Sequence, residues 1–265
     1  LICYIQYMRN SKWQYLLASV VSSILAMGCK EQSVIIVPCL LLFDWMLFKR
    51  NMRSLKVYIE KVYYLIPAIA IFIVTLVANK NTGEEIIGYT IVDRFIFLCY
   101  SSFKYLLISA IPFKLSYLYP FPFQVGEKIP MALWIYPFVI LFIGYVIYLN
   151  RRKPLLVFCT LFFILHLLPV LHVIPLPRYV VAADRYLYIP YIAFAIGLSI
   201  LSYHLYERQR KWILYAGFLY CSYLCVYTAG YAPAWKNSDT LKEHFKEVLK
   251  KRETNLSINF KHEKQ

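Results

Sequence analysis

Long apolar segments constrain the fold of this chain more than any other feature. A helix that crosses the hydrocarbon core of a bilayer needs about 20 mostly apolar residues. Of the 265 residues, 60% are hydrophobic and 16% are charged, and the mean hydropathy is +0.54. Soluble domains are roughly half apolar and a quarter charged. Segments that fit a spanning helix are 13–29, 32–48, 62–78, 131–149, 154–174, 187–205 and 212–229. The sequence therefore predicts an all-α, multi-pass membrane helical bundle.

The basic residues predict which way this bundle faces, because Lys and Arg favour cytoplasmic loops. They gather before the first segment and after the second, fourth and sixth: Arg9, Lys12, Lys49, Arg50, Arg53, Lys56, Lys61, Arg151, Arg152, Lys153, Arg208, Arg210 and Lys211. The opposite loops are longer in total and hold fewer basic residues. We therefore expect the turn at residues 30–31, the loops 79–93 and 113–130, the stretch 180–190 and the C-terminal tail on the non-cytoplasmic side.

The segment 94–112 decides whether this orientation holds. At 100° per residue its Arg, Ser and Lys side chains fall on one arc, and most of its apolar residues lie opposite. We interpret it as a helix lying in the outer membrane interface. The alternative is an eighth span, which would reverse the orientation of everything that follows.

Two groups of charges interrupt the apolar pattern on the predicted outer face. Lys30 and Glu31 stand where Gly, Asn or Ser would make a simpler turn, so they suggest a phosphate contact with an acid that orients it or binds a metal. A solvated interfacial ion pair is the alternative. The second group is the stretch VVAADRYLYIP at 180–190, preceded closely by Arg178.

The second group has the composition of a headgroup site. Arg178 and Arg185 offer rigid forks for phosphate oxygens. Asp184 can hold Arg185 or accept a hydrogen bond from a sugar hydroxyl, and Tyr186 and Tyr188 can stack on a sugar or isoprenoid. We therefore interpret Lys30, Glu31, Arg178, Asp184, Arg185, Tyr186 and Tyr188 as candidate substrate-binding residues.

The remaining ionisable and metal-ligating residues favour structural roles. His166 and His172 are interpreted as core or interface histidines, and Asp44 is expected to reach the interface or to pair with Lys49. The seven cysteines form no CxxC pair and no Cys/His cluster with metal spacing. No metal ligands are assigned; cofactors are unknown, and a divalent cation is left as an option.

Four sequence segments together resemble one protein family. They are CKEQSVIIVPCLLLFDW (29–45), KLSYLYPFP (114–122), ADRYLYIP (183–190) and WKNSDTLKEHFKEVLKKRETN (235–255). In this order they are similar to the "SKE…P…L…YDW", "LS…YP", "ADRYxYxP" and "W.ds..L…N" patterns of the transmembrane and TPR-containing O-mannosyltransferases and their bacterial relatives. The chain thus resembles the GT-C superfamily of membrane glycosyltransferases.

This resemblance implies a fold, an activity and site roles. It implies a GT-C-type bundle that transfers a sugar, mannose in the relatives, from a polyprenyl-phosphate donor to a protein or glycan acceptor on the non-cytoplasmic side. Arg185 and Lys30 would face the donor phosphate, with Asp184 and Glu31 orienting them. The family's catalytic acid lies in a first outer loop that nothing here matches. We expect it upstream of Leu1 in a longer protein, without which this piece would be inactive; Asp184 is the second choice.

The same reasoning gives the domain organisation and the location. We expect a transmembrane domain over 1–230 and an extracytoplasmic tail over 231–265, in which Ser238 or Asp239 caps a helix. That helix would begin a TPR-like array, dock a partner or lie back on the membrane domain. The partners would be the lipid donor, membrane lipids and the acceptor, without nucleic acid. Composition and the lack of further repeats favour a bacterial inner membrane over the endoplasmic reticulum.

Two other functional classes remain as alternatives. One is an O-antigen ligase or polymerase, which should have a long outer loop rich in Arg and His. The other is a non-catalytic transporter or scaffold, which should show inverted repeats and polar residues at the membrane midplane. The outer loops here are short, and the polar residues gather at one face.

Overall fold

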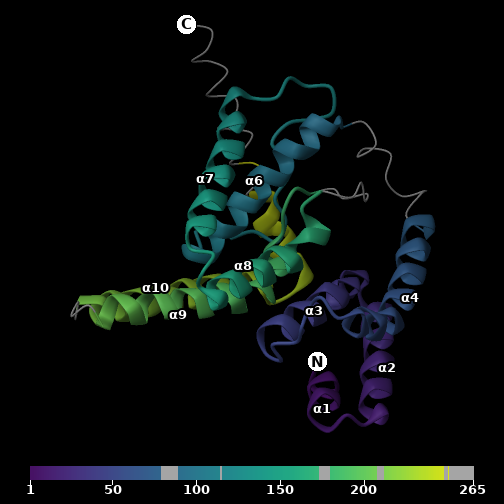
Figure 1. The fold of residues 1–265 in the computed structure, drawn as a ribbon. Coiled ribbons are helices and arrows are strands. Elements are labelled where there is room, and N and C mark those ends of the chain that lie inside the picture. Colours follow the sequence, from purple (N-terminus) through teal and green to yellow (C-terminus); the bar gives the residue numbers. More distant parts are fainter. Residues whose placement is uncertain (79–88, 114, 173–179, 208–211, 248–249, 251–265) are drawn as a thin grey trace, which may run out of the picture.

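A computed structural model shows a chain built from helices (Figure 1). The structure describes all residues except 79–88, 114, 173–179, 208–211, 248–249 and 251–265. The side chains of Glu31 and Leu76 are also not described. Within the described part there is no strand, and an isolated antiparallel bridge joins Tyr119 to Ala182. The all-α prediction is therefore confirmed.

Each predicted spanning segment contains an α-helix, and the end of segment 154–174 lies outside the described residues. The α-helices are α1 (Ile2–Asn10), α2 (Trp13–Cys29), α3 (Ile36–Met46), α4 (Leu55–Ala78), α6 (Ile91–Ala110), α7 (Ile135–Leu149), α8 (Pro154–Leu167), α9 (Pro190–Glu207) and α10 (Trp212–Tyr231). Short 3-10 helices are η1 (Glu31–Ile35), η3 (Met131–Trp134), η4 (Leu168–Val170), η5 (Asp184–Leu187) and η6 (Ala232–Trp235). Three helical stretches are long and apolar enough to cross a membrane, as expected of a membrane protein: Leu55–Thr75, Met131–Leu149 and Trp212–Trp235.

The buried side chains form two separate clusters. The smaller one centres on Tyr4, Leu40 and Tyr64, where α1, α2, α3 and α4 meet. The larger one joins α3, α6 and α8 to the irregular segments around Tyr119 and Ala182. In Figure 1, α6 and α7 stand side by side above α8, while α9 packs along α8 and α10 runs beside α9. The larger cluster supports these irregular segments.

Helix α6 differs from the prediction for segment 94–112. We expected its polar arc to face outward, but Ser101 and Ser109 are 0% and 1% exposed, and Phe95 and Leu107 are exposed instead. Burial of the serines is inexpensive because their hydroxyls donate to carbonyls one turn earlier, on Phe97 and Tyr105. The polar side of α6 therefore faces the protein interior.

The C-terminal tail folds back on α10. Its helix covers the described residues 238–247. Asn237 caps this helix, because its side-chain Oδ1 accepts from the backbone N–H of Thr240 at 2.8 Å. The predicted caps, Ser238 and Asp239, are wrong by one and two residues. The ring of His244 lies 5.5 Å from the ring of Tyr231, centroid to centroid, so the helix contacts the end of α10.

Candidate functional site

The stretch 181–187 is held in place by backbone hydrogen bonds to α6 and to the segment before α7. Tyr119 donates its N–H to the carbonyl of Ala182, and Val181 donates its N–H to the carbonyl of Tyr119, both at 2.9 Å. The N–H of Ala183 donates to the hydroxyl of Tyr105 on α6 at 3.2 Å. These bonds fix the backbone immediately before Asp184, where η5 begins.

Two cations converge on one aromatic ring beside this backbone. The Nζ of Lys30 lies 5.8 Å from the ring centroid of Tyr186. The guanidinium carbon of Arg185 lies 5.2 Å from the same ring and 5.0 Å from that of Tyr117. Cations within about 6 Å of a ring centroid are attracted by its quadrupole. Lys30 and Arg185 are both exposed, so their positive charges remain available to a ligand.

The carboxylate of Asp184 faces inward. Its Oδ1 accepts from the hydroxyl of Tyr119 at 2.7 Å, while its Oδ2 is buried and has no hydrogen-bond partner among the described residues. Burial raises the pKa of Asp184 to about 6, against the opposing effects of the Tyr119 hydrogen bond and the Lys104 charge. The Nζ of Lys104 lies 3.8 Å from the ring centroid of Tyr119. Asp184 therefore titrates close to neutral pH.

A row of tyrosines on α10 fixes the segment that follows α6. Tyr220 and Tyr223 donate their hydroxyls to the carbonyls of Ala110 and Pro112, at 2.8 and 2.6 Å. The hydroxyl of Tyr227 accepts the N–H of Leu115 at 2.9 Å. Residues three or four apart share one face of a helix, which is why these side chains line up. The row holds the chain that leads from α6 to the site.

The structure brings only some of the predicted site residues together. Lys30, Arg185 and Tyr186 are in contact, and Asp184 adjoins them but bonds to Tyr119, with no ion pair to Arg185 between the described side chains. Tyr188 is 85% exposed and makes no contact with this group in the described part of the chain. Arg178 and the side chain of Glu31 lie outside the described residues.

Both histidines near the site are packed in the core, as predicted. The ring of His166 lies 4.1 Å from that of Phe162, and its Nδ1 is 2.9 Å from the Phe162 carbonyl oxygen. His172 is buried, with its Nε2 3.0 Å from the carbonyl oxygen of Val181. Among the described residues, no three His, Cys, Asp or Glu side chains gather as metal ligands would.

Sequence analysis missed several residues of this site. Lys104, Tyr119 and Tyr231 were not identified, although Tyr231 follows the periodicity of the α10 row. That periodicity could have been used to predict a contact face on α10. A helix that only faces lipid does not need hydroxyl groups aligned on one side. Tyr119 could not be found in this way, since its partner Asp184 lies 65 residues further along the chain.

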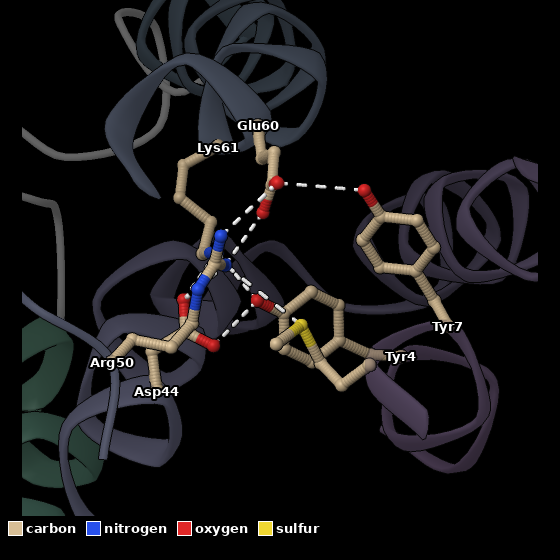
Figure 2. Close-up of polar contacts among 7 residues, drawn as sticks. Tyr4, Tyr7, Asp44, Arg50, Glu60 and Lys61 are labelled. Atoms are coloured by element: carbon tan, nitrogen blue, oxygen red, sulfur yellow. Dashed lines mark hydrogen bonds and ion pairs between the residues drawn. The ribbon is translucent and has the colours of Figure 1, made fainter. Parts of the chain in front are cut away.

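A second polar cluster lies in the smaller core (Figure 2). Asp44 is 0% exposed and accepts from the Tyr4 hydroxyl and from Lys61, each at 2.6 Å. Arg50 contacts Asp44 at 3.3 Å and donates hydrogen bonds from both terminal nitrogens to the Glu60 carboxylate, at 2.6 and 3.1 Å. The expected Asp44–Lys49 pair is therefore wrong. Two carboxylates face two cations, and each charge has a partner.

Comparison with protein-family models, with curated proteins and with solved structures finds no match to this chain. The resemblance to membrane glycosyltransferases therefore rests on the four sequence segments alone.

Proposed function

We propose that this chain is an integral membrane glycosyltransferase of the GT-C type. It takes a sugar, with mannose as the first candidate, from a polyprenyl-phosphate donor and passes it to a protein or glycan acceptor. The observation that carries the proposal is the shared position of Lys30 and Arg185 at the ring of Tyr186. These residues come from two of the four segments that resemble the family, and they lie more than 150 residues apart in the sequence.

The arrangement suits the chemistry of such a donor. When the acceptor hydroxyl attacks the anomeric carbon, the bond from that carbon to the phosphate oxygen breaks and polyprenyl phosphate leaves with the electron pair. The proton of the acceptor hydroxyl passes to a general base, for which Asp184 is the candidate among the described residues. Lys30 and Arg185 can stabilise the negative charge that develops on this leaving group. The adjoining rings of Tyr117 and Tyr186 offer an apolar surface for the isoprenoid next to the phosphate.

The proposal includes an orientation in the membrane. The Lys30 end of α2 and the stretch 180–190 lie at the non-cytoplasmic face, together with the C-terminal tail, and the helices form a multi-pass bundle. The distribution of Lys and Arg supports this orientation. The composition supports a bacterial inner membrane as its location.

Binding of undecaprenyl phosphate in nanodiscs tests the proposal. We expect saturable binding that is lost when the phosphate is replaced by the alcohol, and about tenfold weaker binding for Lys30→Ala or Arg185→Ala, as for the loss of one charge-assisted contact. Lys12→Ala is the matched control. Lys12 and Lys30 flank the two ends of α2, which are about 26 Å apart at 1.5 Å per residue.

Two results would contradict the proposal. One is equal binding of the phosphate and the alcohol, which would mean that the site recognises only the isoprenoid. The other is an equal loss of affinity in Lys12→Ala and Lys30→Ala, which would mean that the phosphate senses the overall charge of the chain and no particular site.

A further inference from the structure

Three buried polar atoms without hydrogen-bond partners belong to one neighbourhood. They are the Oδ2 of Asp184, the hydroxyl of Tyr231 and the Nδ1 of His244. In folded proteins the great majority of buried polar side-chain atoms have a partner, and each exception calls for an explanation. The structure describes all three of these residues, and their remaining contacts are known.

Tyr231 adjoins both Asp184 and His244, although the three residues come from three elements. Tyr231 ends α10, and its hydroxyl lies close enough to the Asp184 carboxylate to affect the ionisation of that carboxylate as a hydrogen bond does. The rings of Tyr231 and His244 lie 5.5 Å apart. Trp235 stands beside this group, with ring centroids 6.4 Å from Tyr231 and 5.9 Å from Tyr117.

The chemistry of the group favours a neutral ligand with several hydroxyls. The Asp184 carboxylate accepts hydrogen bonds, the Tyr231 hydroxyl donates and accepts, and His244 does either according to its tautomer. An anion would be repelled by Asp184, while a cation would be repelled by Lys104, whose charge already acts on that carboxylate. A sugar hydroxyl both donates and accepts, and the apolar face of a sugar ring can rest on Trp235 or Tyr117.

The position of the group indicates which sugar it would hold. Asp184 is followed directly by Arg185, one of the two cations at Tyr186. A sugar whose hydroxyls reach Asp184 would thus have its anomeric phosphate beside Arg185. The helix 238–247, which supplies His244, would then form part of the site.

We propose that Asp184, Tyr231 and His244 form the binding site for the hydroxyl groups of the donor sugar. This inference rests on the proposed function for the identity of the sugar carrier. It assigns Tyr231 and His244 a direct contact with substrate and gives the C-terminal helix a role in sugar recognition.

Binding of methyl α-D-mannopyranoside to the full chain in nanodiscs, followed by saturation-transfer difference NMR, tests the inference. We expect weak saturable binding and none of tetrahydropyran, which has the ring without the hydroxyls. Tyr231→Phe removes one hydroxyl and should weaken binding about tenfold, equivalent to 1.4 kcal/mol. His244→Phe and Asp184→Asn should weaken it to a similar degree or more. Tyr215→Phe, on the same helix and exposed, should have no effect.

The results separate this inference from the proposed function when undecaprenyl phosphate binding is measured on the same variants. Loss of the mannoside with intact phosphate binding in Tyr231→Phe supports the inference. Mannoside binding unchanged in both Tyr231→Phe and His244→Phe, or weakened equally in Tyr215→Phe, overturns it. Specific mannoside binding in a chain that does not recognise the phosphate would overturn the proposed function and leave the sugar site standing.

Discussion

Asp44 and Asp184 are both carboxylates drawn away from water, but their surroundings differ. Asp44 accepts from Tyr4 and Lys61 and is also paired with Arg50, so its charge is compensated on both oxygens. Asp184 has one hydrogen bond, from Tyr119, and its second oxygen has no hydrogen-bond partner in the described part of the chain. One carboxylate is saturated by the protein, and the other retains the capacity to bind something else.

This difference indicates a structural role for Asp44 and supports the ligand-binding role proposed for Asp184. A buried charge is tolerated when it is paired and hydrogen-bonded, and breaking such a pair leaves an uncompensated charge. The cluster around Asp44 joins α1, the end of α3 and the start of α4, so we interpret it as a device that fixes these helices together. An incompletely bonded carboxylate lowers stability and is retained where a ligand needs it.

The largest expected effect is that of Asp44→Asn. The substitution leaves Lys61 and Arg50 facing Glu60 alone, and breaking a buried pair costs about 3–5 kcal/mol. Thermal and denaturant unfolding in detergent should therefore show a large loss of stability. Asp239→Asn, an exposed acid in the tail, is the control. A loss below about 1 kcal/mol in Asp44→Asn would contradict the structural interpretation.

The corresponding substitution, Asp184→Asn, should change the stability of the fold in the opposite direction. The pKa of Asp184 is raised by burial from 3.8 to about 6, so its ionisation opposes folding. Asp184 therefore contributes fully to folding stability below pH about 4, where it is protonated, and this contribution is lost as the pH rises to about 6. Two pKa units correspond to at most about 3 kcal/mol.

Unfolding of wild type and Asp184→Asn between pH 4 and pH 7.5 measures this effect. Above pH 6 the variant should be the more stable protein, and the difference should disappear near pH 4. The groups that act on Asp184 remain in both proteins, so the comparison isolates the carboxyl group; they are Lys104, Ser116, Tyr119 and Tyr231. If Asp184→Asn were less stable than wild type at pH 7.5, the two Asp→Asn substitutions would act in the same direction, and the predicted difference between Asp44 and Asp184 would be wrong.

The tyrosine row should show a smaller, local effect. Tyr227→Phe removes the acceptor of the Leu115 N–H, which should cost about 1 kcal/mol. Hydrogen exchange should become faster at Leu115 and the residues beside it, while α1 and α4 stay unchanged. Tyr215→Phe is again the control, and equal exchange at Leu115 in both variants would show that the row does not hold this segment.

The smallest effect on stability is expected at the exposed cations. Lys30→Ala should change the free energy of unfolding by less than about 0.5 kcal/mol, because cation–π contacts at exposed sites are weak. The same variant should show the clear loss of undecaprenyl phosphate binding described above. A stability loss as large as that of Asp44→Asn would mean that Lys30 is a structural residue.

The sequence predicted the helices well because each apolar segment is a local signal. Boundaries such as 13–29 and 131–149 agree with the structure residue for residue. The prediction was wrong for α6. The arc of Ser and Lys was correctly identified, but it was expected to face away from the protein and instead faces the interior. Amphipathicity tells which residues share a face and does not tell whether water or a polar interior lies opposite that face.

The site was predictable only where its residues stood out against an apolar background. Lys30, Asp184 and Arg185 were chosen as candidates because charges are costly near a membrane. Tyr119, Tyr231 and His244 were missed because tyrosines are common in this chain and because contacts across tens of residues leave no local pattern. Asp44 was assigned the wrong partner for the same reason, since Lys61 is 17 residues away and Lys49 is only five.

The tyrosine row on α10 has a consequence for how this chain can diversify. Its hydroxyls form hydrogen bonds with main-chain atoms of Ala110, Pro112 and Leu115. Every amino acid has the main-chain carbonyl, and every one except proline has the N–H. Side chains along that segment can therefore be exchanged during evolution without dislodging its backbone. The surface of that segment can thus change while its backbone keeps the same position.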